Sequence, residues 1–453
     1  MKATYWGFSW LVLSILLGSP SRADQIQAYF NHRADHSYRD PYYGRDRTGD
    51  DLEAVILGGV ESAARTLDLA VYELDLPRVA RALAKKQAAG VRVRIMLENK
   101  HSHLWRQLTP EERAKLNEHD RAKYDEFVNF ADENRDGVMS PEEAQSHDSL
   151  AILQRGGVKW LDDTSDGSKG SGLMHHKFMV VDGKAVITGS ANFTRSCTHG
   201  DSNKARSIGN ANALLHIESA PLARLFTQEF ELMWVNHQFG LKKTYRGPYA
   251  LKIGPTPVTI QFSPTSKRLG WDASTNALIA RQFKTATKSA DLALFVFSDQ
   301  SIANAMEEAH GRGMKPSVLI DPSFATRYYS ELLDIFGLQM LNPKCAFEAG
   351  NRPWARPVMD SGFTVLDDGD VLHHKFAVVD GERAIVGSHN WSAAANEQND
   401  EALLVIESRE LSQAYTEEFE GLRKRAILGP QPWLYRKIAE AQAKCHAVLP
   451  RAR

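Results

Sequence analysis

The segment HHKFMVVDGKAVITGSAN, which begins at His175, recurs as HHKFAVVDGERAIVGSHN from His373. Both copies fit the pattern H-x-K-x4-D-x6-G-S-x-N with identical internal spacing, and the second follows the first at an offset of 198 residues (373 − 175). So many fixed positions in one register indicate an internal duplication. The pattern therefore predicts a chain built from two similar halves.

The repeated segments also place charged and hydrogen-bonding groups in a fixed arrangement. Because side chains alternate along a strand, His175 and Lys177 share one face of the first strand, and His373 and Lys375 share one face of the second. Each copy ends in a serine and an asparagine, which are Ser190 and Asn192 in the first half and Ser388 and Asn390 in the second. Two copies folded against each other would join two imidazoles, two ammonium groups and two amides. Such a site suits an anion.

The duplication extends upstream of these segments. Each half contains an apolar strand candidate, LDLAVYELD from Leu67 and ADLALFVFSD from Ala290. A helix candidate follows each strand and ends at Gly90 or Gly313, and a second apolar strand comes next, VRVRIML or SVLI. Alternating strands and helices predict an α/β fold with mixed sheets, an α-β-α sandwich in each half.

The offset between the halves changes along the chain and locates an insertion. It is 223 residues from Gly90 to Gly313 but 198 at the repeated segments, so the first half holds about 25 extra residues, which we place in an insert over residues 105–148. These offsets divide the chain into a first half over residues 24–246 and a second half over 260–453. Between them, residues 247–259 contain the Gly and Pro that are typical of a linker.

The insert contains DENRDGVMSPEE, from Asp132 to Glu143, which fits the calcium-loop pattern D-x-N-x-D-G-x5-E. Gly137 permits the sharp turn that this loop needs, and helix candidates lie on both sides. The candidate calcium ligands are the side chains of Asp132, Asn134, Asp136, Ser140 (through water) and Glu143, and the backbone carbonyl of Val138. We therefore expect an EF-hand-like insert with a structural calcium ion. The alternative is an acidic helix–turn–helix that binds no ion.

The first 23 residues differ from the rest of the chain. Lys2 is followed by an apolar run from Trp10 to Leu17 and by small residues up to Ala23, and this order predicts a secretory signal peptide over residues 1–23. An uncleaved membrane anchor is the alternative, although the apolar run is short for a span. We expect a soluble protein exported to the periplasm or the extracellular space. Its formal net charge of −1 gives no global basic field that would indicate a nucleic-acid partner.

The chain has three cysteines, an odd number for an exported protein. Cys345 and Cys445 can pair within the second half, but spacing alone does not decide whether they do. Cys197 lies close to the first repeated segment and is interpreted as a buried thiol.

The repeated pattern resembles the HKD signature of the phospholipase D superfamily, with the family spacing in both halves. The resemblance covers roughly residues 26–430 and implies a phosphodiesterase with one active site at a pseudo-twofold axis, a covalent phosphohistidine and no cofactor for catalysis. It assigns the roles of nucleophile and general acid/base to His175 and His373. It assigns phosphate binding to Lys177, Lys375, Ser190, Asn192, Ser388 and Asn390. The motif members Asp182 and Asp380 are expected to shape the turn after each strand.

In this superfamily a carboxylate that follows the motif often orients a catalytic imidazole. Glu401 takes this place in the second half, whereas the aligned residue of the first half is Asn212. Because a carboxylate favours an imidazolium more than an amide does, we predict that His373 begins protonated as the general acid and that His175 is the neutral nucleophile. Asp201, in a nine-residue insertion of the first half, is an alternative source of the missing carboxylate.

The resemblance leaves the substrate open, because the superfamily contains phospholipases, phospholipid synthases and nucleases. We expect hydrolysis of phospholipid head-group phosphodiester bonds at a membrane surface, by a monomer with no obligate protein partner. A non-specific nuclease is the alternative, with the basic residues Arg195, Lys204, Arg206, Arg352 and Arg356 on the nucleic-acid backbone. A non-catalytic calcium-dependent binding protein is a third possibility, which the two intact motifs disfavour.

Overall fold

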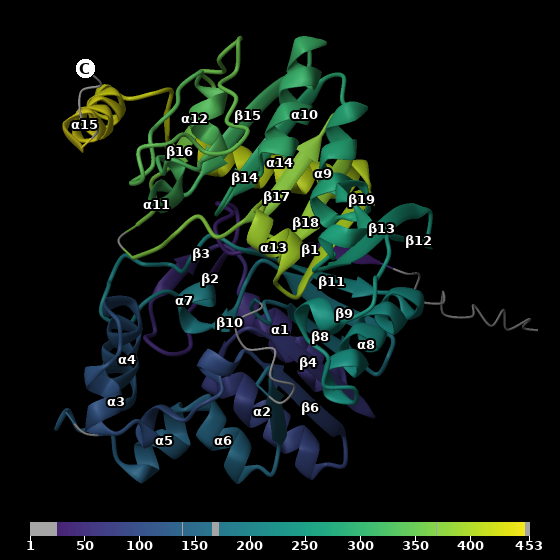
Figure 1. Cartoon of the computed structure of the whole chain (residues 1–453). Coiled ribbons are helices and arrows are strands. Elements are labelled where there is room, and N and C mark those ends of the chain that lie inside the picture. The colour runs from purple at the N-terminus through teal and green to yellow at the C-terminus, as the bar shows by residue number, and fades with distance from the viewer. Residues whose placement is uncertain (1–24, 138, 165–171, 368, 449–453) are drawn as a thin grey trace, which may run out of the picture.

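The computed structural model describes residues 25–137, 139–164, 172–367 and 369–448. Two α/β halves, each built on its own mixed sheet, lie against each other, with the first half below the second in Figure 1. The predicted fold class, two similar α/β halves with mixed sheets, is confirmed. The predicted signal peptide, residues 1–23, lies outside the described residues.

The first half is organised around a seven-stranded sheet in the order β1-β11-β9-β8-β4-β6-β7. Its strands are β1 (Ile26–Phe30), β4 (Thr66–Val71), β6 (Arg92–Leu97), β7 (Lys159–Asp162), β8 (Lys177–Val181), β9 (Ala185–Gly189) and β11 (Ala213–Glu218). β4, β6 and β7 are parallel, and the remaining neighbours pair antiparallel. The repeated segment forms β8 and β9, which are buried along their whole length, so their sequence is almost continuously apolar.

The second half repeats this topology and extends it at both edges. Its strands are β12 (Tyr249–Ile253), β13 (Thr256–Ser263), β14 (Ser289–Leu294), β15 (Lys315–Ile320), β16 (Gly362–Thr364), β17 (Lys375–Val379), β18 (Arg383–Gly387), β19 (Glu401–Glu407) and β20 (Ala426–Leu428). The order is β12-β13-β19-β18-β17-β14-β15-β16-β20. From β13 to β16 the strands match the first sheet in order and direction. Only β12 and β20 are additions.

The prediction of a linker over residues 247–259 is wrong. These residues mostly form β12 and the start of β13, which pair as an antiparallel hairpin at the edge of the second sheet. Gly254 and Pro255 make the two-residue turn between Ile253 and Thr256, and Gly254 has a φ of 55°. A Gly-Pro pair is as typical of a tight turn as of a linker, so composition alone misplaced the boundary.

Helices cover both faces of each sheet. In the first half, α1 (Leu52–Ser62), α2 (Pro77–Ala88) and α6 (Ser149–Arg155) share one core, and α8 (Ala220–Trp234) belongs to another. In the second half, the corresponding helices are α9 (Thr275–Lys284), α10 (Gln300–Gly311) and α12 (Glu331–Ile335), and on the other face α14 (Arg409–Arg423). The apolar sides of α8 and α14 enter one core with residues from both halves, including the ring contacts Phe226–Phe262 and Phe30–Tyr415. The halves therefore share a continuous interface.

Short elements complete the two halves, and several of them lead into the site described below. They are β2 (Ser37–Arg39), β3 (Asp46–Thr48), β5 (Leu74–Asp75), β10 (Phe193–Thr194), α7 (Arg195–Thr198), α11 (Pro322–Ala325), α13 (Ala393–Glu397), η1 (Asn99–His101), η3 (Gly240–Lys242), η4 (Lys267–Leu269) and η5 (Trp271–Ala273).

The insert forms a small group of helices at the lower left of Figure 1. Its elements are η2 (Trp105–Gln107), α3 (Pro110–Ala114), α4 (Glu118–Ala131) and α5 (Pro141–His147). Helix α4 docks on the first half, because Lys123 Nζ lies 2.6 Å from Glu73 and Glu126 binds the buried guanidinium of Arg195 at 3.0 Å. The insert is thus anchored by ion pairs close to the first motif.

The C-terminal helix α15 (Pro432–Val448) is joined to the second half by a disulfide between Cys345 and Cys445. Cys197 is free and buried. Within the ranges that the structure describes, no helix combines the length and the apolar character needed to cross a membrane.

Candidate active site

The segments that precede the two motif strands cross between the halves. His175 N donates to the carbonyl of Asp400 at 3.0 Å, and Asp400 N donates to the carbonyl of Leu173 at 2.8 Å. The mirror contact joins His373 N to the carbonyl of Ala211 at 3.0 Å. Each motif strand therefore begins against the opposite half. This exchange brings the two copies of the motif into one site.

The two motif lysines lie in the same geometry on either side of the pseudo-twofold axis. Lys177 Nζ donates to the carbonyl of His175 at 2.8 Å, and Lys375 Nζ donates to the carbonyl of His373 at 2.7 Å. Both side chains are buried. Burial lowers the pKa of Lys177 to about 8, and burial together with the neighbouring Lys177 holds the pKa of Lys375 well below its usual value. Both lysines therefore lose their protons more easily than a free lysine while no anion is bound, and an anion between them would favour their charged forms.

The two motif histidines are buried beside these lysines. Burial, followed by the charges of Lys177 and Lys375, holds the pKa of His175 well below its usual value. The pKa of His373 is lowered in the same way, by burial and then by Lys375 and Lys177. Both imidazoles are therefore harder to protonate than a free imidazole while no anion is bound. An anion in the site would reverse the electrostatic part of both shifts.

Each histidine is oriented by a residue of the other half. His175 Nδ1 lies 2.7 Å from Glu401 Oε1, and His373 Nδ1 lies 3.0 Å from Asn212 Oδ1. Glu401 is fully buried, and burial raises its pKa. The amide nitrogen of Asn212 donates to the carbonyl of Asn210 at 2.9 Å, so its oxygen is the atom turned to His373. Nδ1 is thus the engaged nitrogen of both rings, which leaves Nε2 for chemistry.

The expectation that Glu401 acts on His373, the histidine of its own half, is wrong. Alignment of the halves shows that Glu401 and Asn212 are equivalent. Each of them, however, contacts the histidine of the other half. Asp201 does not replace the missing carboxylate either, because it pairs with Lys204 at 3.1 Å. The carboxylate-paired histidine is therefore His175.

The motif serines and asparagines lie around these pairs. Ser190 Oγ donates to Asn212 Oδ1 at 2.9 Å, and Ser388 Oγ donates to Glu401 Oε2 at 2.7 Å, so each serine holds the residue that orients a histidine. Asn192 and Asn390 each have a buried amide oxygen with no hydrogen-bond partner among the described residues.

The motif aspartates lie at the far end of the motif strands. Asp182 accepts the backbone amides of Ala64, Arg65 and Thr66, and Asp380 accepts those of residues 287–289. Partial burial opposes ionisation, but these amides lower the pKa of both carboxyls. Both residues have a positive φ, 52° and 57°, in the turn after the strand. The structure thus places them as turn residues, away from the histidines.

Two aromatic pairs flank the histidines and were not identified from the sequence. Tyr72 contacts His175 with ring centroids 5.1 Å apart, and His101 lies 4.7 Å from Tyr72. In the second half Phe295 contacts His373 at 5.0 Å, and Phe324 lies 4.7 Å from Phe295. Both pairs are related by the offset of 223 residues that also relates Gly90 to Gly313. A search for aromatic residues related by this offset could have identified both pairs from the sequence.

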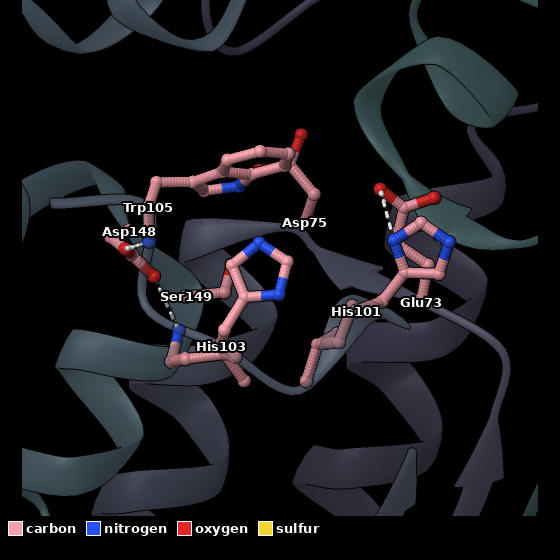
Figure 2. Close-up of a pocket in the computed structure, with 9 residues that line it drawn as sticks. Glu73, Asp75, His101, His103, Trp105, Asp148 and Ser149 are labelled. Carbon is pink, nitrogen blue, oxygen red and sulfur yellow. Dashed lines mark hydrogen bonds and ion pairs between the residues drawn. The ribbon is translucent and has the colours of Figure 1, made fainter. Parts of the chain in front are cut away.

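A small pocket lies on the insert side of His101 (Figure 2). Figure 2 shows His101 beside Glu73, with Nδ1 and a carboxylate oxygen 3.8 Å apart, and His103 beneath the ring of Trp105. His103 Nε2 has no hydrogen-bond partner in the described part of the chain. Burial lowers the pKa of His103 and brings that of His101 to about 4. Residues of the first half and Trp105 of the insert line this pocket together.

The predicted calcium ligands gather at the loop between α4 and α5. Asp132 accepts the backbone amides of Asp136 and Gly137 at 3.1 and 2.7 Å, so its carboxylate faces the inside of the loop. Glu143 accepts the amides of Glu133 and Ser140 at 2.9 and 2.8 Å, which draws the end of the loop to its start. Carboxylate and amide oxygens of this kind fit calcium. Val138 lies outside the described residues.

Comparison with known proteins agrees with this fold. A family model described as "Cardiolipin synthase, PLD-like domain" matches residues 56–234 and 279–423. A mitochondrial cardiolipin hydrolase of Xenopus tropicalis is 31% identical over 139 residues, which are 30% of this chain and 55% of that protein. A phospholipase D of Rickettsia felis is 27% identical over 147 residues, 32% of this chain and 63% of that protein. The matches therefore span about half to two thirds of each relative.

A solved structure shows the same fold over most of the chain. The phosphatidylserine synthase of Haemophilus influenzae superposes with a TM-score of 0.55 and 13% identity, covering 87% of this chain and 91% of that one. The fold and the site define a duplicated α/β protein in which the two motif copies meet between the halves. Because the family model covers well over half of the sequence, the chain belongs to the phospholipase D-like family.

Proposed function

We propose that this protein is a phosphodiesterase that hydrolyses the head-group phosphodiester bond of phospholipids through a phosphohistidine. The observation that supports it most is the single buried site in which His175, Lys177, His373 and Lys375 converge from both halves. The side chains of Lys177 and Lys375, and the amide NH2 groups of Asn192 and Asn390, which can donate hydrogen bonds, suit a phosphodiester, whose equatorial oxygens gain negative charge during displacement.

In this proposal His175 is the nucleophile. Its Nδ1–H donates to Glu401, which fixes the tautomer whose Nε2 carries the lone pair. Bonding of Nε2 to phosphorus makes the ring cationic, and the adjacent carboxylate stabilises that charge. His373 is oriented by an amide, which offers its protonated form less stabilisation and so makes that form the stronger acid. His175 remains the nucleophile and His373 the general acid, as predicted from the sequence. The reason differs, because the carboxylate of Glu401 contacts His175 and not His373.

The reaction then proceeds in two displacements. First, Nε2 of His175 bonds to phosphorus, the bond from phosphorus to the head-group oxygen breaks, and protonated His373 gives its proton to that oxygen. Second, His373 removes a proton from water, the water oxygen bonds to phosphorus, and the P–N bond breaks. The products are a free head-group alcohol and a phosphate monoester, and both histidines return to their starting states.

Binding of the substrate allows His373 to take up the proton that it needs. Both histidines have a lowered pKa while no anion is bound, because they are buried next to two lysines. A phosphodiester carries a negative charge that offsets Lys177 and Lys375 and raises the pKa of both rings. Binding and protonation are therefore coupled in this account.

Two observations favour phospholipid over nucleic acid as the substrate. The relatives named above are a cardiolipin hydrolase and a phospholipase D. Three of the five basic residues considered for a nucleic-acid backbone are already paired: Arg195 with Glu126, Lys204 with Asp201, and Arg352 with Glu307. Paired cations release fewer counterions and bind a phosphate backbone weakly.

We further infer that turnover needs no metal, because the histidines and lysines together supply a nucleophile, proton transfer and charge stabilisation. Calcium, in this account, binds the loop from Asp132 to Glu143 and stabilises the insert. The protein is exported to the periplasm or the extracellular space. It works as a monomer, because the duplication supplies both motif copies in one chain.

The test is a set of parallel assays on phosphatidylcholine, phosphatidylethanolamine, cardiolipin and single-stranded DNA, each with and without EDTA. We expect head-group release from at least one lipid, unchanged by EDTA and absent in a folded His373→Asn variant. Cleavage of DNA without lipid hydrolysis would favour the nuclease. Loss of lipid hydrolysis in EDTA, with the protein still folded, would contradict metal-independent turnover.

A further inference from the structure

A buried charge network lies next to the His175–Glu401 pair. Lys243 Nζ is 2.6 Å from Glu229 Oε1 and 2.8 Å from Asp400 Oδ1, and its side chain is fully buried. Arg246 Nε is 2.7 Å from the second carboxylate oxygen of Glu229. Two carboxylates and two cations therefore meet without solvent, at the point where the end of the first half reaches the second.

Each carboxylate that Lys243 binds leads to one member of the catalytic pair. Glu229, on α8, is 3.0 Å from His176 Nε2, and His176 directly follows His175. Asp400 directly precedes Glu401, and its carbonyl accepts the backbone N–H of His175 at 3.0 Å. Lys243 Nζ thus connects the chain segments that carry the two partners of the His175–Glu401 hydrogen bond.

The network has the composition of a metal site but is balanced by the chain itself. His176, Glu229 and Asp400 bring ligand-type atoms within 4.8 Å of one another. Burial opposes ionisation of Glu229, yet Arg246 and Lys243 hold its pKa well below its usual value. The two carboxylates already face two fixed positive charges. A metal ion would have to displace both cations.

The mirror position in the other half has no such network. His374 Nε2 is 2.9 Å from Glu418 on α14, which repeats the contact of His176 with Glu229. The residue aligned with Asp400 is Ala211, at the offset that aligns Asn212 with Glu401. Across the described part of the chain, Glu418 makes no ion pair with a lysine or arginine. The cations are therefore confined to the side of the carboxylate-paired histidine.

We propose that Lys243 is a positioning residue that holds His175 and Glu401 in register, an inference that rests on the proposed role of His175. Lys243 touches neither substrate nor reacting atoms. A short hydrogen bond to a carboxylate weakens quickly when its partners shift, and a misplaced nucleophile slows attack much more than it weakens binding. The expected signature is therefore a lower kcat with a nearly unchanged KM.

The single variant Lys243→Met leaves two buried carboxylates with one cation, so it tests folding more than catalysis. The informative variant is Lys243→Met/Asp400→Asn, which keeps the Glu229–Arg246 pair in balance. A second balanced variant, Lys243→Met/Glu229→Gln, also removes Lys243 and leaves one carboxylate, Asp400, and one cation, Arg246; it serves if the first does not fold. The matched control is Lys288→Met, which removes an exposed lysine paired with Glu382 at 3.4 Å.

For either balanced variant we expect a kcat about 10-fold or more below wild type and a KM within about threefold. We also expect loss of the downfield proton NMR signal of His175 Nδ1–H, assigned by its absence in His175→Asn. Lys288→Met keeps all three properties. A folded balanced variant with a wild-type kcat and an unchanged Nδ1–H signal overturns the proposal. If the wild type hydrolyses no phosphodiester, the proposed function fails, while the NMR comparison still decides whether Lys243 positions the pair.

Discussion

Glu401 of the second half accepts a hydrogen bond from Nδ1 of His175 in the first half at 2.7 Å, across 226 residues of sequence. The aligned residue, Asn212, contacts His373 at 3.0 Å. Each ring is thus held by the opposite half, and neither half contains a complete site. Because one partner is a carboxylate and the other an amide, the two histidines differ chemically although their motifs are alike.

Replacement of the carboxylate tests this difference. Glu401→Gln keeps the shape and a hydrogen-bond acceptor but removes the charge that stabilises a phosphorylated His175. A charge-assisted hydrogen bond contributes about 1.5–3 kcal/mol, so we expect kcat to fall by about 10- to 100-fold with the fold retained. The matched variant Asn212→Asp gives His373 a carboxylate and should raise its pKa. A Glu401→Gln enzyme with wild-type kcat would show that the contact is only structural.

Anion binding should take up protons. The pKa of His175 and of His373 is held well below its usual value, and that of Lys177 is about 8, in the absence of an anion. A bound anion raises all three, so sulfate, which does not titrate in this range, should bind more tightly as the pH falls from about 9 to about 6. Calorimetry in two buffers of different ionisation enthalpy measures the proton uptake. Affinity that is independent of pH, with no uptake, would contradict the electrostatic account.

The calcium loop gives a prediction about stability. Saturation to about 100 times the dissociation constant should raise the free energy of unfolding by about 2.7 kcal/mol. Glu143→Lys should abolish this gain and spare turnover at low temperature. Glu142→Lys is the control, because Glu142 is an exposed neighbour in the first turn of α5. Thermal melts with calcium and with a chelator measure the effect, and equal melts for the wild type would rule the ion out.

The motif aspartates should matter for folding rather than for catalysis. Asp182→Ala removes the acceptor for three backbone amides. We expect the free energy of unfolding to fall by about 1–3 kcal/mol, with kcat within about threefold of wild type. Asp380→Ala is the matched variant in the second half. A large loss of kcat without a loss of stability in urea titrations would place these carboxylates in the reaction instead.

Much of the fold was predictable because the duplication supplies an internal alignment. The motif spacing placed His, Lys, Ser and Asn of both copies in one site, and the offsets located the insert between β6 and α6. These predictions rest on strand alternation and on the regular order of strands and helices. Both are local properties of the sequence.

The pairing of residues across the axis was not predictable in the same way. An alignment shows that Glu401 is equivalent to Asn212, but the contact of Glu401 with His175 depends on how the two sheets dock. The charges of Glu229, Lys243 and Asp400 likewise come from segments that meet only in the folded chain. The hairpin at Gly254 was missed for a different reason, because turns and linkers share their composition.

The identity of the phosphorylated histidine tests the central claim most directly. A p-nitrophenyl phosphodiester, whose leaving group needs no protonation, is mixed with the His373→Asn and His175→Asn variants, quenched in alkali and analysed by peptide mass spectrometry. We predict that the phosphoryl group accumulates on His175 in His373→Asn, and that His175→Asn carries none. A phosphoryl group on His373 in the His175→Asn variant, with none on His175 in the other, would contradict the account.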